Sequence, residues 1–253
     1  MNDVIYKYRK ADFNSILSLV SDNLWFSKPK YFNDPFETLV NLPSESYQSL
    51  IHDFYHLFIE SKEAKLDKSL KDLDKTMSIA FPDVYNKVAD SQRSFIVNEH
   101  SEKGVCCFSE INDSILLWSH YSQDHTGIVI AYKTNSFNSS LFHIAKVNYS
   151  KSAKLPEVKR SDSQNREKII NKMLLTKYSD WKYEKEIRVI YNKKIPKDNK
   201  GINLQFKNSI DHIIIGIKTD PLFLTILNRL LPDIELMQCK YINGTYRLEV
   251  INI

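Results

Sequence analysis

Two glutamates and an arginine alternate along residues 181–191 in a pattern that could do chemistry. Successive side chains of a β-strand point to opposite faces, so Glu184, Glu186 and Arg188 would share one face. The apolar side chains of the other face, which would point to the core, are Ile187, Val189 and Tyr191. The charged row is either a solvated face with a cross-strand ion pair or a carboxylate at the lip of a cleft. In a cleft, a glutamate would serve as a base, a metal ligand or a stabiliser of developing positive charge.

A second polar segment, residues 31–37, places Asn33 and Asp34 before Pro35 and between aromatic residues. Asn-Asp-Pro favours the start of a turn, and the aromatic neighbours would tie that turn to the core. Asn33 and Asp34 therefore either bond their own backbone or point to a ligand.

A third segment combines the end of a helix with its exit into a strand. Trp118, Tyr121 and His125 would share one face at helical spacing. His120 and His125 are either structural groups at a helix end or functional ones. Gly127 suits the turn into the next strand. Two histidines without a carboxylate at helical spacing give no strong indication of a metal site.

The opening segment Tyr6–Arg9 alternates tyrosine with basic residues, which puts Lys7 and Arg9 on one face of a strand. The two cations are either solvated edge charges or a clamp for an anion. Lysine-rich stretches at 151–159 and 193–200 lack the interleaved aromatic residues of base-stacking surfaces. We interpret those stretches as solvated loops.

The elements that must position these segments follow from hydrophobic periodicity. The predicted strands are 4–8, 24–27, 104–109, 127–132, 144–149, 184–191, 202–206, 212–217, 234–241 and 246–251. The predicted helices after residue 100 are 113–122, 166–178 and 222–231. Strands with interspersed helices, without a regular βαβα alternation, predict an α+β fold with a mixed, mainly antiparallel sheet.

Helices are also predicted before residue 100. Between the first two strands, Asp12 is a candidate N-cap. The apolar stripe expected on that helix consists of Phe13, Ile16, Leu17, Val20 and Leu24. Residues 44–97 carry two further helical stripes and are expected to form a helical insertion. The length favours one domain, 1–253, that contains this insertion.

Composition and charge limit the ligand, the location and the cysteine chemistry that the sequence allows. The 253 residues include 35 Lys and Arg against 31 Asp and Glu, a formal charge of +4 that permits an anionic ligand without demanding one. Neither a signal peptide nor an apolar run long enough to span a membrane is recognisable, which predicts a cytoplasmic protein. Cys106, Cys107 and Cys239 lack metal-ligand spacing and are expected to be small buried hydrophobes.

Taken together, these segments resemble a bacterial family known only as domain of unknown function 2971. The motifs that carry the resemblance are Tyr6–Arg9, Leu24–Ser27, Phe32–Glu37, Cys107–Ser109, Trp118–Tyr121 and Trp181–Arg188. Their order and combination are specific, and they extend over most of the chain.

The chain is also distantly similar to the ADP-ribosyltransferase superfamily, in the order of a basic first strand, a strand ending in serine and a later strand bearing glutamate. This resemblance implies an NAD-consuming enzyme, a toxin or anti-phage effector, with a nucleic-acid or protein acceptor. It implies that Glu186, or else Glu184, stabilises the ribosyl cation, and that Arg9 or Lys7 holds the dinucleotide. The residues expected to line the nucleotide cleft are Lys7, Arg9, Asn33, Asp34, Ser109, Trp118, His120, Tyr121 and Arg188.

Two alternatives remain open. In the first, Asp34, Glu37 and Glu186 hold a divalent metal in an enzyme that processes nucleic acids. In the second, the polar segments brace the turns and strands of a non-catalytic module that binds a ligand or nucleic acid, since likeness of fold does not establish function.

Overall fold

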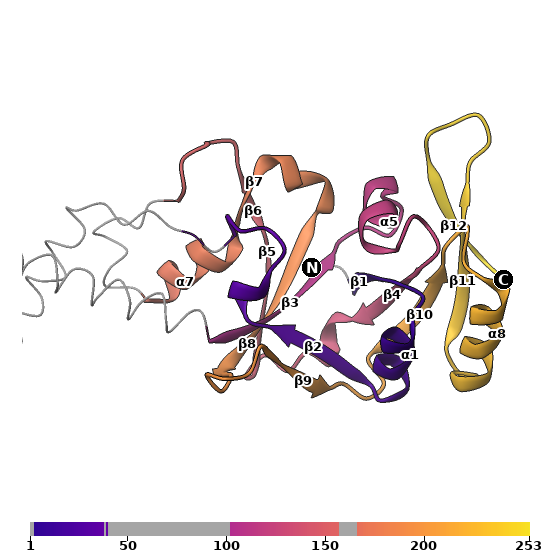
Figure 1. The fold of residues 1–253 in the computed structure, drawn as a ribbon, viewed down its shortest axis with the longest axis horizontal. Coiled ribbons are helices and arrows are strands. Elements are labelled where there is room, and N and C mark those ends of the chain that lie inside the picture. The colour runs from indigo at the N-terminus through magenta and orange to yellow at the C-terminus, as the bar shows by residue number, and fades with distance from the viewer. Residues whose placement is uncertain (1–2, 38, 40–101, 157–165) are drawn as a thin grey trace, which may run out of the picture. The chain divides into compact units, whose positions relative to one another are not determined.

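The computed structural model describes residues 3–37, 39, 102–156 and 166–253. The chain divides into two compact units. The first comprises Met1–Phe32, Lys103–Lys151 and Lys177–Ile253, and the second comprises Asn33–Glu102 and Ser152–Thr176. The first unit contains the main sheet, whose strands are labelled in Figure 1.

The main sheet has ten strands within the described residues. Eight strands follow the order β12, β11, β10, β4, β1, β3, β2 and β9, while β8 pairs with β3 and with β5. Among the described strands of this sheet, β10 and β11 pair in parallel and the other pairs are antiparallel. The strands are β1 (Val4–Arg9), β2 (Asn23–Ser27), β3 (Lys103–Ser109), β4 (Ile128–Lys133), β5 (Phe142–Lys146), β8 (Glu186–Lys194), β9 (Gly201–Gln205), β10 (Ile210–Ile215), β11 (Glu235–Tyr241) and β12 (Leu248–Asn252).

Helices α1 (Phe13–Val20) and α5 (Ile115–Tyr121) cover opposite faces of the sheet, below and above β1 and β4 in the view of Figure 1. Leu19 of α1 belongs to the larger core cluster with Ile5. Trp118 of α5 belongs to a smaller cluster with Val129. Because Ile5 and Val129 point to opposite sides of the sheet, each helix closes a separate core.

Side-chain caps begin both helices. The Asp12 carboxylate accepts a hydrogen bond from the Ser15 amide at 2.8 Å, so the predicted N-cap is confirmed. The Ser114 hydroxyl accepts one from the Leu117 amide at 3.3 Å. Each cap satisfies a backbone N–H that the first helical turn leaves without a partner.

The apolar stripe predicted for α1 is wrong for most of its residues, although Ile16 packs against the larger core cluster. Phe13 and Leu17 are 74% and 54% exposed, whereas Leu19 and Ser15 are almost fully buried. The prediction anchored the stripe on Leu24, but that residue lies in β2 and packs into the core from there. A helix of eight residues is oriented by its two connections to the sheet, which here override its periodicity.

The remaining described elements surround this sheet or belong to the second unit. Strands β6 (Asn148–Ser150) and β7 (Thr176–Tyr178) form a separate two-stranded sheet. The helices are η1 (Pro29–Tyr31), η2 (Thr134–Ser136), α7 (Arg166–Leu175), η3 (Ser179–Glu184) and α8 (Pro221–Leu230). In the part of the chain that the structure describes, no helix has the length and apolar character needed to span a membrane.

The predicted fold class is confirmed at the level of an α+β fold with a mixed, mainly antiparallel sheet. The observed strands agree with the predicted ones to within a few residues, except that residues 144–149 divide between β5 and β6, and β7 replaces the end of the predicted helix 166–178. The predicted insertion 44–97 lies outside the described residues, so the arrangement as one domain stays a prediction.

Gly127, just before β4, leaves no room for a side chain. A Cβ atom there would lie 2.2 Å from the Arg9 carbonyl oxygen and 2.9 Å from the Ser122 Cα. Because both neighbours are backbone, we expect Gly127→Ala to lower the free energy of unfolding by about 1–3 kcal/mol, measured by urea denaturation. The matched control is Gly244→Ala, where nothing lies within 4 Å and only the φ of +75° costs about 1 kcal/mol. Equal losses in the two variants would contradict this explanation.

Candidate functional site

The candidate site begins where β3 and β8 lie side by side. Their register pairs Ser109 with Glu186 and Cys107 with Arg188, so these four side chains share one face of the sheet. The side chains of the opposite face, which join the larger core cluster, include Phe108, Ile187 and Val189. The predicted alternation of charged and apolar residues along β8 is therefore present.

A left-handed residue joins η3 to β8. Lys185 has φ 44° and ψ 51°, a conformation that costs a non-glycine residue about 1–2 kcal/mol. Its carbonyl accepts a hydrogen bond from the Glu110 amide at 3.0 Å, which fixes the turn against the end of β3. Glu184 therefore ends η3 and Glu186 begins β8, instead of both lying on one strand as predicted.

Lys177 of β7 joins the two glutamates. Its Nζ donates to Glu184 Oε2 at 2.6 Å and to Glu186 Oε2 at 3.1 Å. Arg188 Nε donates to Glu186 Oε1 at 2.7 Å, and Arg188 Nη2 donates to Glu186 Oε2 at 3.2 Å. The four side chains, between 0% and 6% exposed, form what we name the buried ion cluster. Two cations balance two carboxylates, and burial rules out the solvated-face interpretation.

Glu186 is the more tightly held carboxylate. Burial alone would raise its pKa, but the charge and hydrogen bonds of Arg188 and the charge of Lys177 outweigh that effect and lower the pKa to about 2. Both of its oxygens accept hydrogen bonds from Arg188, and the guanidinium carbon lies 5.2 Å from the Phe32 ring centroid. Glu186 is thus a fixed anion that serves as the counter-ion of Arg188.

Glu184 has a different environment. Its Oε1 accepts a hydrogen bond from the Tyr121 hydroxyl, at the end of α5, at 2.6 Å, and its Oε2 accepts from Lys177. Burial raises the pKa of Glu184, and the opposing effects of Lys177 and Tyr121 do not cancel that rise. Of the two carboxylates, Glu184 is the one whose proton affinity lies above its ordinary value.

Tyr149 and Cys107 complete the surroundings of Glu186. The Tyr149 hydroxyl oxygen accepts a hydrogen bond from the Glu186 backbone amide at 2.8 Å. Burial, followed by the charges of Glu186 and Glu184, raises the pKa of Tyr149 to about 12. Burial and Glu186 also raise the pKa of the Cys107 thiol. Both groups are therefore neutral near pH 7, and Cys107 lacks the lowered pKa of a reactive cysteine.

Aromatic side chains lie beside the buried ion cluster. Trp181 lies 4.7 Å from Lys177 Nζ, measured to the ring centroid, and 6.2 Å from the Tyr183 ring. His120 packs edge-on against Tyr183 at 5.9 Å, and its Nδ1 lies 3.2 Å from the Tyr183 hydroxyl. His120 is exposed and the other two rings are half-buried. They offer faces on which a planar ligand could stack.

Ser109 and Trp118, both predicted to line the cleft, occupy structural positions. Ser109 Oγ donates to the Glu184 carbonyl at 2.7 Å and accepts from the Ile111 amide at 3.2 Å. Trp118 is fully buried, and its indole nitrogen donates to the Asn112 carbonyl at 2.8 Å. Ser109 thus holds the backbone of Glu184, while Trp118 anchors α5.

Lys7 and Arg9 do not join the buried ion cluster. Lys7 Nζ donates to the Cys107 carbonyl at 2.9 Å and lies 5.1 Å from the Phe108 ring centroid. Arg9 Nε donates to the Ser15 hydroxyl of α1 at 3.3 Å. Both cations therefore lie on the α1 face of the sheet, whereas the cluster lies on the opposite face.

Asn33, Asp34 and Glu37 belong to the second unit. Asp34 Oδ1 accepts a hydrogen bond from the Phe36 amide at 2.9 Å, as expected for a side chain that bonds its own turn. Within the described ranges, no three His, Cys, Asp or Glu side chains gather as ligands for a metal ion.

Neither Lys177 nor Tyr149 stands out in the sequence. Lys177 lies in the three-residue strand β7, where the sequence predicted the end of a helix. No periodicity links it to Glu184 and Glu186, because η3 and the turn at Lys185 separate them. The periodicity of the sequence therefore could not predict that Lys177 is the central cation of the site.

Residues 117–189 match the model of a family described as a protein of unknown function, DUF2971. The matched range contains the Trp118–Tyr121 segment and the whole buried ion cluster, and it confirms the predicted resemblance for this part of the chain. No curated protein and no solved structure matches the chain. Neither the family match nor these searches shows a similarity to ADP-ribosyltransferases.

Removing one cation should unbalance the buried ion cluster. Arg188→Met deletes the guanidinium that binds both oxygens of Glu186, so we expect the free energy of unfolding to fall by about 3–5 kcal/mol in urea denaturation. Lys193→Met, at an exposed position of the same strand, should change it by less than about 0.5 kcal/mol. An Arg188→Met protein as stable as this control would show that the guanidinium does not compensate a buried charge.

Acid should destabilise the fold through Glu186. Its folded-state pKa of about 2 lies below the ordinary value of 4.5, so its contribution is present above pH 4.5 and is lost as the pH falls toward 2. This loss is on the order of 3 kcal/mol, measured as unfolding free energy against pH. Glu186→Gln should flatten that acid slope. Glu184 contributes with the opposite sign and in a different range: because its pKa is raised, its contribution is present below pH 4.5 and is lost as the pH rises above that value. Glu184→Gln should therefore change the pH dependence above pH 4.5 and leave the acid slope below it. An acid slope that Glu184→Gln flattens and Glu186→Gln preserves would refute the assignment.

Proposed function

We propose that this chain is an NAD-consuming enzyme of the ADP-ribosyltransferase type, in which Glu184 assists cleavage of the bond between nicotinamide and ribose. The observation that carries the proposal is the Glu184 carboxylate, which is buried and held between Lys177 and Tyr121. Such a preorganised carboxylate in a water-poor site is suited to stabilising positive charge that develops in a transition state.

The surroundings favour Glu184 over Glu186 for this role. Glu186 binds two cations and is the counter-ion of Arg188, so little of its charge is available to a substrate. Glu184 shares one cation with Glu186 and otherwise binds a neutral phenol. A shift of the Tyr121 side chain would expose Glu184 Oε1 without breaking the ion pairs of the cluster.

The reaction balances with this single carboxylate. The bond between the nicotinamide nitrogen and ribose C1′ breaks, and its electron pair neutralises the pyridinium ring that leaves. The ribose takes on positive charge, which the ionised Glu184 stabilises, until a nucleophile on the acceptor, or water, adds to C1′ and loses a proton. The aromatic rings of Trp181 and Tyr183 provide stacking faces for the nicotinamide.

A role as a toxin or anti-phage effector would follow from this chemistry, because it depletes NAD or modifies a macromolecule. The expected acceptor is a nucleic acid or a protein. The formal charge of +4 is compatible with a nucleic-acid acceptor.

A second candidate is a non-catalytic binding module, and a specific observation favours it. Lys177 and Arg188 balance the charges of Glu184 and Glu186, as expected of a cluster that braces β7, η3 and β8. In that case the cluster specifies the fold and Glu184 has no substrate.

Nicotinamide release separates the two candidates. Purified protein would be incubated with NAD in the presence of DNA, RNA or bacterial lysate, and nicotinamide would be measured by chromatography. We expect release by the wild type and a loss of about 100- to 1,000-fold in Glu184→Gln, the range seen when one electrostatic stabiliser is removed. Thermal unfolding of each variant is measured in parallel. A variant that remains folded at the assay temperature has not lost its activity through unfolding.

The matched control is Glu110→Gln. This change removes a carboxylate that directly follows β3 and pairs with Lys146. It should release nicotinamide at the wild-type rate. A wild-type protein that releases none with any acceptor, or a folded Glu184→Gln protein of full activity, would exclude the transferase and leave the binding module.

A further inference from the structure

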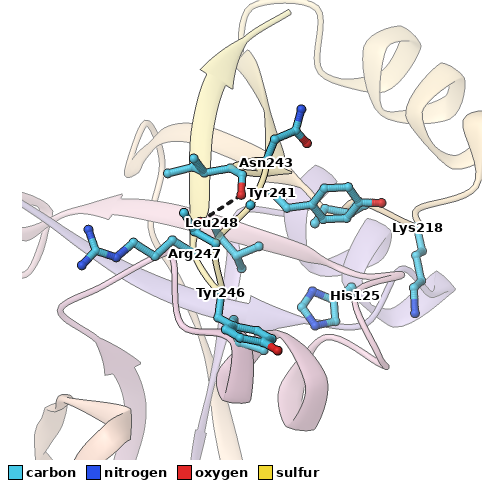
Figure 2. A pocket seen from close by; sticks show the side chains of 12 residues that line it. His125, Lys218, Tyr241, Asn243, Tyr246, Arg247 and Leu248 are labelled. Atoms are coloured by element: carbon cyan, nitrogen blue, oxygen red, sulfur yellow. Dashed lines mark hydrogen bonds between the residues drawn. The ribbon is translucent and has the colours of Figure 1, made fainter.

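A pocket of about 350 Å³ lies in the first unit, away from the residues of the buried ion cluster. It is formed by the hairpin of β11 and β12, by Ile217 and Lys218 after β10, and by Ile115 and His125. Figure 2 shows the side chains of the hairpin around His125 and Lys218. None of the residues expected to line the nucleotide cleft lines this pocket, so the proposed function leaves it unexplained.

Two tyrosines of the hairpin expose their rings at the pocket. Tyr246 is 98% exposed and Tyr241 is 63% exposed. The turn between them is ordered: the Ile242 amide donates to the Arg247 carbonyl at 3.0 Å, and Gly244 has a φ of +75°. The rings are therefore presented on a fixed frame while their apolar faces remain in water, which is typical of a surface that stacks on a ligand.

The charge of the pocket has one sign. Lys218 and Arg247 are the charged residues that line it, and no carboxylate does. In Figure 2 the two side chains lie on opposite sides of the site, with the tyrosines between them. Alternating cations and aromatic rings suit a ligand that carries both repeated anionic groups and planar rings.

His125 adds a polar group that lacks a partner. Within the described residues, its Nδ1 is buried without a hydrogen bond, although Nε2 lies 3.3 Å from Ser119 Oγ. Burial and the charge of Lys218 lower the pKa of His125, so the ring is neutral near pH 7. It follows Gln123 and Asp124 in a run of left-handed residues, with φ of 49°, 55° and 68°. Each non-glycine residue in this conformation costs about 1–2 kcal/mol, so the surrounding contacts must hold the segment in place.

We infer that this pocket binds single-stranded nucleic acid. Bases stack on Tyr241 and Tyr246, and phosphates pass Lys218 and Arg247. A single strand fits better than a duplex, because the tyrosines need base faces that a duplex hides. The inference stands on this pocket alone and is independent of whether Glu184 acts on NAD.

Fluorescence anisotropy with labelled 12-nucleotide oligo-uridine and oligo-thymidine, and with a duplex of equal length, tests the inference. Single strands should bind more tightly than the duplex. Tyr246→Ala should weaken the binding of single strands by roughly 5- to 150-fold, the range for loss of one stacked base. Lys218→Glu and Arg247→Glu should each weaken it and reduce the salt dependence.

Matched controls lie elsewhere on the first unit. Phe13→Ala removes a ring that is 74% exposed on α1, and Lys207→Glu reverses an exposed charge, so both should bind as the wild type does. Tyr246→Ala binding equal to that of Phe13→Ala would overturn the inference. So would the absence of binding at low salt, a preference for the duplex, or competition by uridine monophosphate as effective as that of the 12-mer.

Discussion

The bond that Lys177 makes with two glutamates at once is the interaction on which the candidate site depends. Its ammonium is almost fully buried and donates to Glu184 and to Glu186 from different elements. An ion of this kind is stable away from water only when charged partners surround it, since an unpaired buried charge costs several kcal/mol. The positions of β7, η3 and β8 are therefore coupled, because moving any of them would leave a buried charge without its partner.

The two carboxylates share the available positive charge unequally. Glu186 is bound by Arg188 as well as Lys177, whereas Glu184 has Lys177 and the hydroxyl of Tyr121. Their pKa values consequently move in opposite directions from the ordinary value. Neighbouring carboxylates whose environments separate their pKa values are the usual means by which a site divides a structural anion from a reactive one.

Local backbone geometry explains which parts of this structure could be predicted from the sequence. The Asp12 cap and the alternation of Glu186 and Arg188 against the core depend on neighbours within a few residues. The role of Lys177 depends on tertiary pairing across a 3-10 helix and a left-handed turn, which no periodicity encodes. The prediction that Phe13 lies on the buried face of α1 was wrong for a related reason. The connections of a short helix, and not its periodicity, decide which face is buried.

Helix α5 ties both candidate sites to the same core. Its last residue, Tyr121, bonds Glu184, while the buried Trp118 stacks on His125 with the ring planes 8° apart and the centroids 6.3 Å apart. The His125 carbonyl in turn accepts the Lys218 amide at 3.0 Å, which fixes one wall of the hairpin pocket. Because a fully buried indole cannot rotate without opening the core, α5 holds Tyr121 and His125 in one rigid frame. The backbone positions of Tyr121 and His125 are therefore set by the same core.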